Sequence, residues 1–188
     1  MTRQFSHYRT VEPSQTEFAI ELDEAREYLD IPGAYQDDKL CTLILDAQEE
    51  FQRLTHRAIV PQTFVYEECS PWNNIELPLP PVTAIVSVKS KDNLEDAWVA
   101  VDSADYIVDI TRSPAEIVWI DSRPEFVQVT YECGYAAGSA PANFKVTLLQ
   151  LIAFVFENRG DIEARMPTAL KSRLQGQSAG TVLGFWSS

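Results

Sequence analysis

The chain has 188 residues and a mass of 21.2 kDa, enough for one hydrophobic core with an elaboration but too short for two full domains. Hydrophobic residues make up 45% and charged residues 23% of the chain, which excludes bulk disorder. The net charge of -13 excludes a protein that grips phosphate backbones over its whole surface, because such binding needs clustered lysine and arginine.

The chain carries no targeting or membrane signal that we can identify. Residues 1–16 are polar, and the longest apolar-rich stretch, Phe144 to Phe156, is too short to cross a bilayer. We therefore expect neither secretion nor membrane insertion. The three cysteines lie far apart without a C-x-x-C pair, which predicts neither a disulfide framework nor a zinc site and favours a reduced cytosol.

Two helices are predicted in the first third of the chain. Residues 22–29 are rich in helix formers, and Pro32 and Gly33 follow them. Asp37 and Asp38 can cap a second helix over residues 38–55, whose apolar residues recur at spacings of three and four. These apolar residues are Leu40, Leu43, Ile44, Ala47, Phe51 and Leu54.

The middle of the chain predicts a small antiparallel β unit. After Pro61, short runs rich in β-branched and aromatic residues alternate with turn residues such as Asp92-Asn93 and Ser113-Pro114. The pattern leaves the order of the strands open. The expected strands are 63–66, 75–77, 84–88, 98–101, 106–110, 117–120 and 126–132.

A nearly all-apolar helix and a basic tail are predicted at the end of the chain. Residues 142–158 leave hardly any polar face, which indicates a buried helix, and 168–174 can form a further short helix. From Ala164 to Ser188 there is no acid and the charge is +3, against -16 for the remainder. This asymmetry favours a tail that docks on an acidic neighbour, such as another copy of the chain.

Together these elements predict an α+β protein: a small bundle of three main helices, with an inserted antiparallel β subdomain and an extended C-terminal tail. We expect an N-terminal arm over residues 1–20, a helical part over 21–62 and a β-rich insertion over 63–134. A core helix over 141–160 completes the helical part, and a docking tail covers 161–188.

Several segments are informative as an ordered set. After the first two helices, residues 55–63 (THRAIVPQT) combine a helix end, an apolar pair and a Gln-Thr that opens a strand. Residues 77–82 (LPLPPV) are a proline-rich entry into a later strand. Residues 129–135 (VTYECGY), Pro141 and a helix closing on residues 157–159 (ENR) complete the set.

This set resembles the tailed-phage head-tail connector proteins, also called adaptor or head-completion proteins, in their longer version with a β insertion. The resemblance runs through residues 20–160. His56 departs from it, because the family usually has glycine there. Since histidine tolerates the left-handed conformation less well, we expect the helix to end differently in this chain.

The resemblance implies a structural virion protein, not an enzyme, with no cofactor, metal or catalytic residue. It implies a ring of about a dozen copies beneath the portal protein. The ring would extend the DNA channel and provide the platform for a downstream neck, stopper or tail protein. Double-stranded DNA would pass without specific binding, because carboxylates repel its backbone. The protein would be made in the host bacterial cytoplasm and reside at the head-tail junction, without membrane contact.

The functional residues are then interface residues, contacting the portal or a neighbouring subunit. Arg53 and Arg57 lie four apart on one helix and can pair with Glu49 or with the acids of a partner. An aromatic pair near the C-terminus can anchor in the pocket of a partner. The expected interface residues are Arg53, Arg57, Arg159, Arg165, Lys171, Arg173, Phe185 and Trp186.

Two other functions remain open. A ligand- or carbohydrate-binding β module on a helical base predicts a pocket lined by Trp98 or Trp119, although packing within a small sheet is the commoner explanation of such aromatic residues. A metal-assisted hydrolase predicts a carboxylate cluster, although a solvated helix face explains the same acids. The candidate metal ligands are Asp46, Glu49, Glu50, Asp161 and Glu163.

The histidines and cysteines favour structural roles. His7 and His56 are the only histidines, and no G-x-S-x-G or catalytic cysteine signature accompanies them. Cys41 and Cys133 are expected to be buried, inert thiols.

Overall fold

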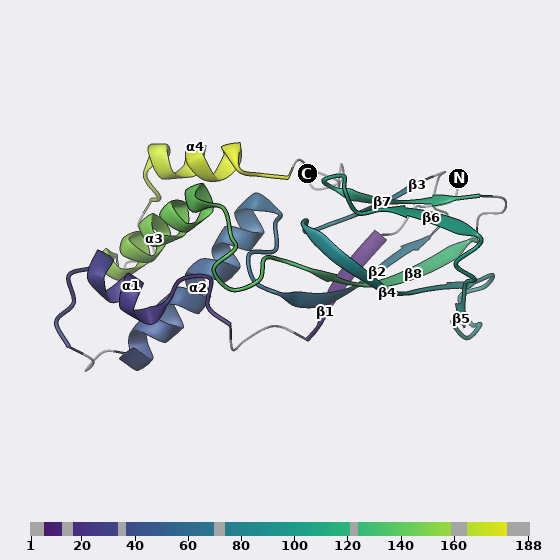
Figure 1. Ribbon diagram of the computed structural model, residues 1–188, viewed down its shortest axis with the longest axis horizontal. Helices are drawn as coiled ribbons and strands as arrows, with labels where there is room; N and C mark the ends of the chain where they lie inside the picture. Colours follow the sequence, from purple (N-terminus) through teal and green to yellow (C-terminus); the bar gives the residue numbers. More distant parts are fainter. Residues whose placement is uncertain are drawn as a thin grey trace. The chain divides into compact units, whose positions relative to one another are not determined.

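The computed structural model describes residues 6–12, 17–33, 37–69, 74–120, 124–158 and 165–179. Over these residues the chain is an α+β protein with four helices and two antiparallel sheets (Figure 1). It divides into two compact units: unit 1 comprises residues 1–14, 61–134 and 181–188, and unit 2 comprises residues 15–60 and 135–180. The predicted α+β class is confirmed, but the helical part has four helices instead of three main ones.

Unit 2 is built around two long helices, α2 (Asp37–Thr55) and α3 (Ala142–Glu157). The short helices α1 (Leu22–Tyr28) and α4 (Thr168–Gly176) each pack on both of them. The three- and four-residue spacing predicted for α2 holds, since Leu40, Ile44, Ala47 and Phe51 are all at most 1% exposed. The rings of Phe51 and Phe144 lie 5.6 Å apart and join α2 to α3.

The apolar helix α3 belongs to this core. Its residues Leu148, Leu151 and Ile152 are fully buried, which explains why the sequence leaves it hardly any polar face. No helix among the described residues is long and apolar enough to span a membrane.

Helix α4 confirms the short helix predicted over residues 168–174, but it lies in the segment that was expected to be an extended tail. Leu170 and Leu174 are buried in the core of unit 2, and the side-chain amide of Gln177 donates to the hydroxyl oxygen of Thr147 on α3. Residues 165–179 are therefore not an extended tail, because one face of α4 completes the helical core. Residues 159–164 and 180–188 lie outside the described residues.

Unit 1 contains both sheets. The five-stranded sheet has the order β1-β2-β8-β4-β5, and the three-stranded sheet has the order β3-β7-β6. Figure 1 shows them as two layers. The strands are β1 (Ser6–Glu12), β2 (Gln62–Cys69), β3 (Asn74–Leu77), β4 (Val82–Lys91), β5 (Val99–Ala100), β6 (Tyr106–Asp109), β7 (Ala115–Trp119) and β8 (Phe126–Cys133).

Buried alternate residues show which face of each sheet carries the core. Ile75 and Leu77 of β3 and Ile117 of β7 are fully buried on one face of the three-stranded sheet. In the other sheet, Phe64 and Tyr131 are opposite one another in the β2–β8 register, and their rings stack with centroids 6.2 Å apart. The Tyr131 hydroxyl donates to the Pro78 carbonyl just after β3, at 2.7 Å, which links the two sheets.

Strand β1 was not predicted. It lies within the segment expected to be an arm and pairs antiparallel with β2, from Ser6 opposite Glu68 to Glu12 opposite Thr63. A polar edge strand lacks the alternating pattern on which the prediction relied, since its backbone pairing needs no apolar face.

His56 ends helix α2 in the left-handed conformation, with φ of 52°. Its backbone N–H still donates to the Gln52 carbonyl at 2.8 Å. The expectation that the helix would end differently without glycine is therefore wrong: the histidine adopts the conformation that glycine adopts more easily.

Replacing His56 with glycine should stabilise unit 2. A residue with a Cβ is destabilised by about 1–2 kcal/mol in this conformation. Glycine avoids that penalty but loses more backbone entropy on folding, so His56→Gly should raise the free energy of unfolding by about 0.5–1 kcal/mol. His56→Ala is the matched control and should be less stable than His56→Gly by about 1 kcal/mol. Chemical denaturation followed by helical circular dichroism measures both. Equal stability of the two variants would contradict the left-handed assignment.

Candidate interaction surface

The described residues contain no candidate metal site. No group of three or more histidine, cysteine, aspartate or glutamate side chains among them could hold a metal ion. Of the predicted cluster, Glu50 is paired with Arg53, while Asp46 and Glu49 are exposed on α2. Asp161 and Glu163 lie outside the described residues. The hydrolase alternative therefore gains no support from this part of the chain.

The aromatic residues proposed for a ligand pocket are used for packing within unit 1. Trp119 is 8% exposed and meets the edge of Tyr106, with ring centroids 5.9 Å apart. Lys91 lies over the Trp98 ring, its Nζ 4.6 Å from the centroid, where a cation is attracted by the face of the ring. These contacts favour the packing explanation of Trp98 and Trp119.

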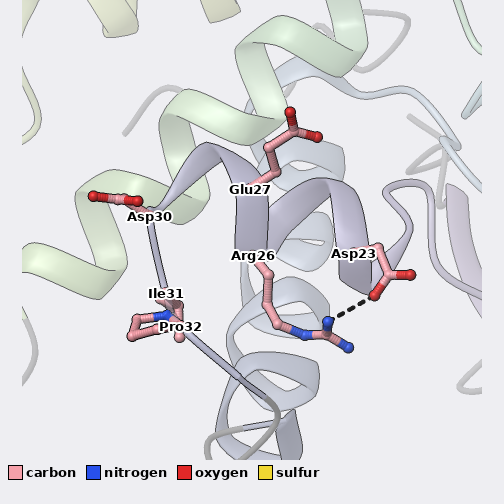
Figure 2. Close-up of a pocket in the computed structure, with 6 residues that line it drawn as sticks. All are labelled: Asp23, Arg26, Glu27, Asp30, Ile31 and Pro32. Carbon is pink, nitrogen blue, oxygen red and sulfur yellow. Dashed lines mark ion pairs between the residues drawn. The ribbon is translucent and has the colours of Figure 1, made fainter.

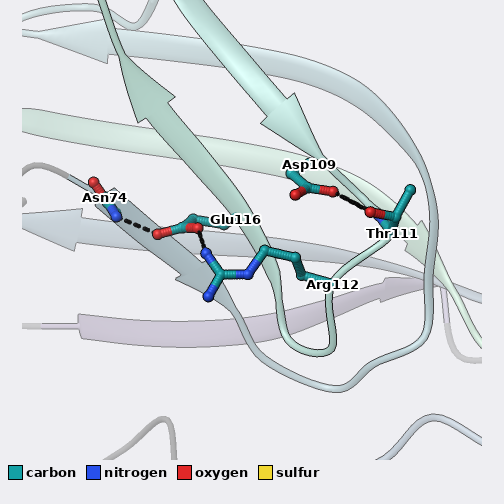
Figure 3. A network of polar contacts seen from close by, with 5 residues as sticks. All are labelled: Asn74, Asp109, Thr111, Arg112 and Glu116. Carbon is teal, nitrogen blue, oxygen red and sulfur yellow. Dashed lines mark hydrogen bonds and ion pairs between the residues drawn. The ribbon is translucent and has the colours of Figure 1, made fainter.

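A polar network holds one end of the three-stranded sheet (Figure 3). Glu116 on β7 is largely buried, accepts a hydrogen bond from the Asn74 amide of β3 and pairs with Arg112 in the β6–β7 turn. At the same turn the Thr111 hydroxyl donates to Asp109, and this hydrogen bond lowers the pKa of the Asp109 carboxyl. A buried carboxylate needs such partners to stay charged, so the network is structural.

Arg53 and Arg57 are four residues apart but differ in what they contact. Arg53 is exposed on α2 and forms a bidentate ion pair with Glu50, with N–O distances of 2.7 and 2.6 Å. The predicted partner within the helix, Glu49, is not the one used. Arg57 is half-buried: its Nε donates to the Gln177 carbonyl at 2.7 Å, and its guanidinium lies 5.8 Å from the centroid of the Phe144 ring. Arg57 therefore joins the ends of α2 and α4 to the start of α3.

The remaining predicted interface residues include three exposed bases near or on α4. Arg165 precedes the helix, and Lys171 and Arg173 project from its outer side. Arg173 donates to the Gln150 side chain of α3 at 3.0 Å. Arg165, Lys171 and Arg173 are thus all exposed, with Lys171 and Arg173 on opposite flanks of the buried side of α4, whereas Arg159, Phe185 and Trp186 lie outside the described residues.

An open pocket of about 530 Å³ lies beside α1 and the turn that follows it (Figure 2). Its one cation, Arg26, is already occupied by Asp23 at 2.7 Å and Asp37 at 3.0 Å. The exposed carboxylates of Glu27 and Asp30 project around the same pocket. These acids were not predicted as functional residues, because they are ordinary residues of an amphipathic helix and its end.

Unit 1 exposes large apolar side chains that sequence analysis also missed. Around edge strand β6, Ile107 is 59%, Ile110 43% and Ile120 51% exposed. On and before β5, Leu94 is 75% and Val99 65% exposed. Such residues on edge strands mark surfaces suited to contact with another chain. The alternation in the sequence located the strands but not the face that stays uncovered.

The cysteines differ in burial. Cys133 is buried at the end of β8 as predicted, and burial raises the pKa of its thiol to about 12. Cys41 is only half-buried, so the expectation of a buried thiol is wrong there. It lies on the half-exposed side of the apolar stripe of α2, next to Leu40, which is 1% exposed.

Removing the Arg57 side chain should destabilise unit 2 far more than removing that of Arg53. Arg57→Ala loses a hydrogen bond from a charged donor and the contact over Phe144, and should lower the free energy of unfolding by about 2 kcal/mol. Arg53→Ala is the matched control on the same helix, and should cost at most about 0.5 kcal/mol because its pair is exposed. Equal losses in chemical denaturation would contradict the bridging role of Arg57.

Cys133 should resist alkylation while the protein is folded. The thiolate is the reactive form, and a pKa of about 12 leaves about one part in ten thousand of it at pH 8. Iodoacetamide labelling mapped by mass spectrometry should modify Cys41 and Cys69 first. All three should react once the chain is denatured, which controls for reagent quality. Labelling of folded Cys133 as fast as Cys41 would show that its burial is wrong.

Comparison with known proteins gives structural neighbours only. No protein-family model and no curated protein matches the chain. It is similar to a chain from the neck of an empty gene transfer agent (GTA) particle computed with C6 symmetry, with a TM-score of 0.75 and 19% identity over 95% of this chain and 98% of that chain.

Two further neighbours agree. A chain from the virion of a native GTA particle has a TM-score of 0.72 and 18% identity, covering 94% of this chain and 97% of that one. A chain from the neck of a native GTA particle computed with C12 symmetry has a TM-score of 0.69 and 20% identity, covering 95% and 98%. This chain therefore has the fold of a component of these particles, and the resemblance to head-tail connectors is confirmed at the level of the fold.

Proposed function

We propose that the chain is a structural subunit of a virion neck: a head-tail connector that assembles as a ring of about a dozen copies beneath the portal. The ring extends the DNA channel and gives the tail its attachment platform, and the subunit performs no covalent chemistry. The chain is made in the host cytoplasm and acts in the virion.

The observation that carries this proposal is the extent of the structural likeness. It covers 94–95% of this chain and 97–98% of each neighbour, so it includes the helical unit and both sheets. Fold alone does not determine function, but here the neighbours come from particles and their necks, where a subunit acts through its surfaces.

The charge of the chain supports passage of DNA without binding. Unit 1 has fourteen acids and six bases, and unit 2 has fourteen acids and nine bases, giving net charges of -8 and -5. Both units are therefore acidic. A channel lined with such a protein repels the phosphate backbone, so that DNA slides without adhering.

The exposed apolar residues support assembly. Ile107 and Ile120 lie near one another at the start of β6, because Ile107 is opposite Val118 in the β6–β7 register and the Ile120 N–H donates to the Asp105 carbonyl; Ile110 is exposed just after the strand. A protein that stays alone in solution gains nothing from exposed isoleucines along one edge strand, whereas a ring subunit can cover them.

The test is to mix the purified chain with the portal ring encoded in the same genome. We expect native mass spectrometry to find one stoichiometric complex and electron microscopy to show a symmetric collar on one face of the portal. A portal ring from an unrelated genome is the control and should stay bare. A chain that ignores its own portal, even on assembled heads, would refute the connector function.

The C-terminal residues can be tested in the same assay with a short deletion. Removing residues 180–188 takes away Phe185 and Trp186 but leaves Leu170 and Leu174, which the helical core needs. We expect this truncated chain to remain folded and to bind the portal more weakly, because buried aromatic anchors dominate many interfaces. Unchanged binding would remove the two aromatic residues from the proposed portal contact.

A further inference from the structure

We propose that neighbouring copies in the ring meet through two oppositely charged faces of unit 2. The acidic face consists of Asp23, Glu27 and Asp30, on α1 and the turn after it. The basic face is the exposed outer surface of α4 and of the residues just before it, which carries Arg165, Lys171 and Arg173. The inference rests on the proposed function, since it assigns the seam of the proposed ring.

The acidic face has more negative charge than its own chain neutralises. Residues 17–33 contain six acids and one arginine, a net charge of -5. That arginine, Arg26, is held by Asp23 and Asp37. Within the described part of unit 2, Glu27 and Asp30 have no cation partner, and both are exposed beside the pocket of Figure 2. Gln48 of α2 accepts a hydrogen bond from the Ala19 backbone at 2.7 Å, which fixes the segment leading into α1.

The basic face is displayed on a fixed support. Residues 165–179 contain three bases and no acid, a net charge of +3. Leu170 and Leu174 anchor α4 in the core, so that Lys171 and Arg173 are held outward. Arg165 and Lys171 have no carboxylate partner in the stretches of unit 2 that the structure describes. A rigid display lowers the entropy lost when these charges meet a partner.

The two faces fit a second copy of the chain better than they fit each other. Helices α1 and α4 both pack on α2 and α3, and Figure 1 shows them on different sides of α3. In a closed ring each contact joins two different faces of neighbouring subunits, so a chain that carries one acidic and one basic face is complementary to its own copy. Three basic charges are also few for holding a DNA duplex beside an acidic protein.

Charge reversal on each face, followed by mixing, tests the seam. The first variant is Glu27→Lys with Asp30→Lys, and the second is Arg165→Glu with Lys171→Glu. Alone, each puts like charges across every seam, so assembly on the portal should weaken about tenfold or more. Mixed in equal amounts they restore opposite charges at every seam, and native mass spectrometry should find alternating rings with equal numbers of both variants. Rising salt should weaken the wild-type ring.

The matched control reverses two exposed acids of unit 1 that belong to neither charged face, Glu125→Lys with Glu132→Lys, and should assemble like the wild type. Circular dichroism verifies that each variant is folded, and rescue by mixing excludes a folding defect as the cause of lost assembly. If the wild type forms the collar and either seam variant alone does so equally well, the seam is wrong and the connector function stands. If the variants stay apart when mixed, the seam is also wrong. A wild type that forms no collar overturns both.

Discussion

Helices α2 and α3 are separated in the chain by the whole β-rich segment, yet they share one hydrophobic core. Phe51 meets Phe144, and the fully buried residues of α3 share one core with Leu40, Ile44 and Ala47 of α2. The chain leaves unit 2 after Val60 and returns at Tyr135, so this packing closes a long loop whose entropy cost grows only slowly with its length. The position of α1 and α4, and with them every charged side chain discussed for unit 2, depends on the α2–α3 pair.

Much of the fold could be predicted from the sequence because its elements carry strong local signals. The apolar spacing of α2, the nearly continuous apolar run of α3 and the short β-branched strands were predicted within a few residues of their observed ends. The pairing of those strands into two sheets was not predictable, since several of the predicted runs have only three to five residues and contain little information about their partners. Strand β1 was missed because an edge strand forms through its backbone. His56 was misjudged because the packing of Phe51 and Ile59 on either side outweighs a local preference of about 1–2 kcal/mol.

The candidate interaction surface could be predicted less well from the sequence than the fold could. Sequence analysis selected arginines by type, and the structure separates them: Arg57 is occupied inside unit 2, while Arg165 and Lys171 are exposed. Glu27 and Asp30 carry no signal in sequence, because an acidic residue on a helix is normally a solvated one. Their significance comes from the lack of a cation partner among the described residues, since the nearby Arg26 is held by Asp23 and Asp37, and that is a property of the folded chain.

The two kinds of surface place opposite demands on the protein before assembly. Exposed isoleucines around β6 favour association, but edge strands with apolar faces also favour wrong association. Asp102, Asp105 and Asp109 are close to these residues in the sequence and add charge to the same strand and its approach, which discourages pairing of one β6 with another. Acidic charge in unit 1 therefore has a protective role that does not depend on DNA.

A seam built from exposed charges suits a ring that must close in one place only. Each exposed ion pair contributes about 0.2–1 kcal/mol, so two free subunits in solution gain little by meeting. On a portal, each subunit is already held by another contact, and the effective concentration of its neighbours is far higher. The free energies of the weak contacts between neighbours then add around the ring. The last subunit to enter forms two such contacts at once. Strong apolar seams would close rings away from the portal, where they serve no purpose, so in the proposed ring the weakness of the charged contact would tie assembly to the portal.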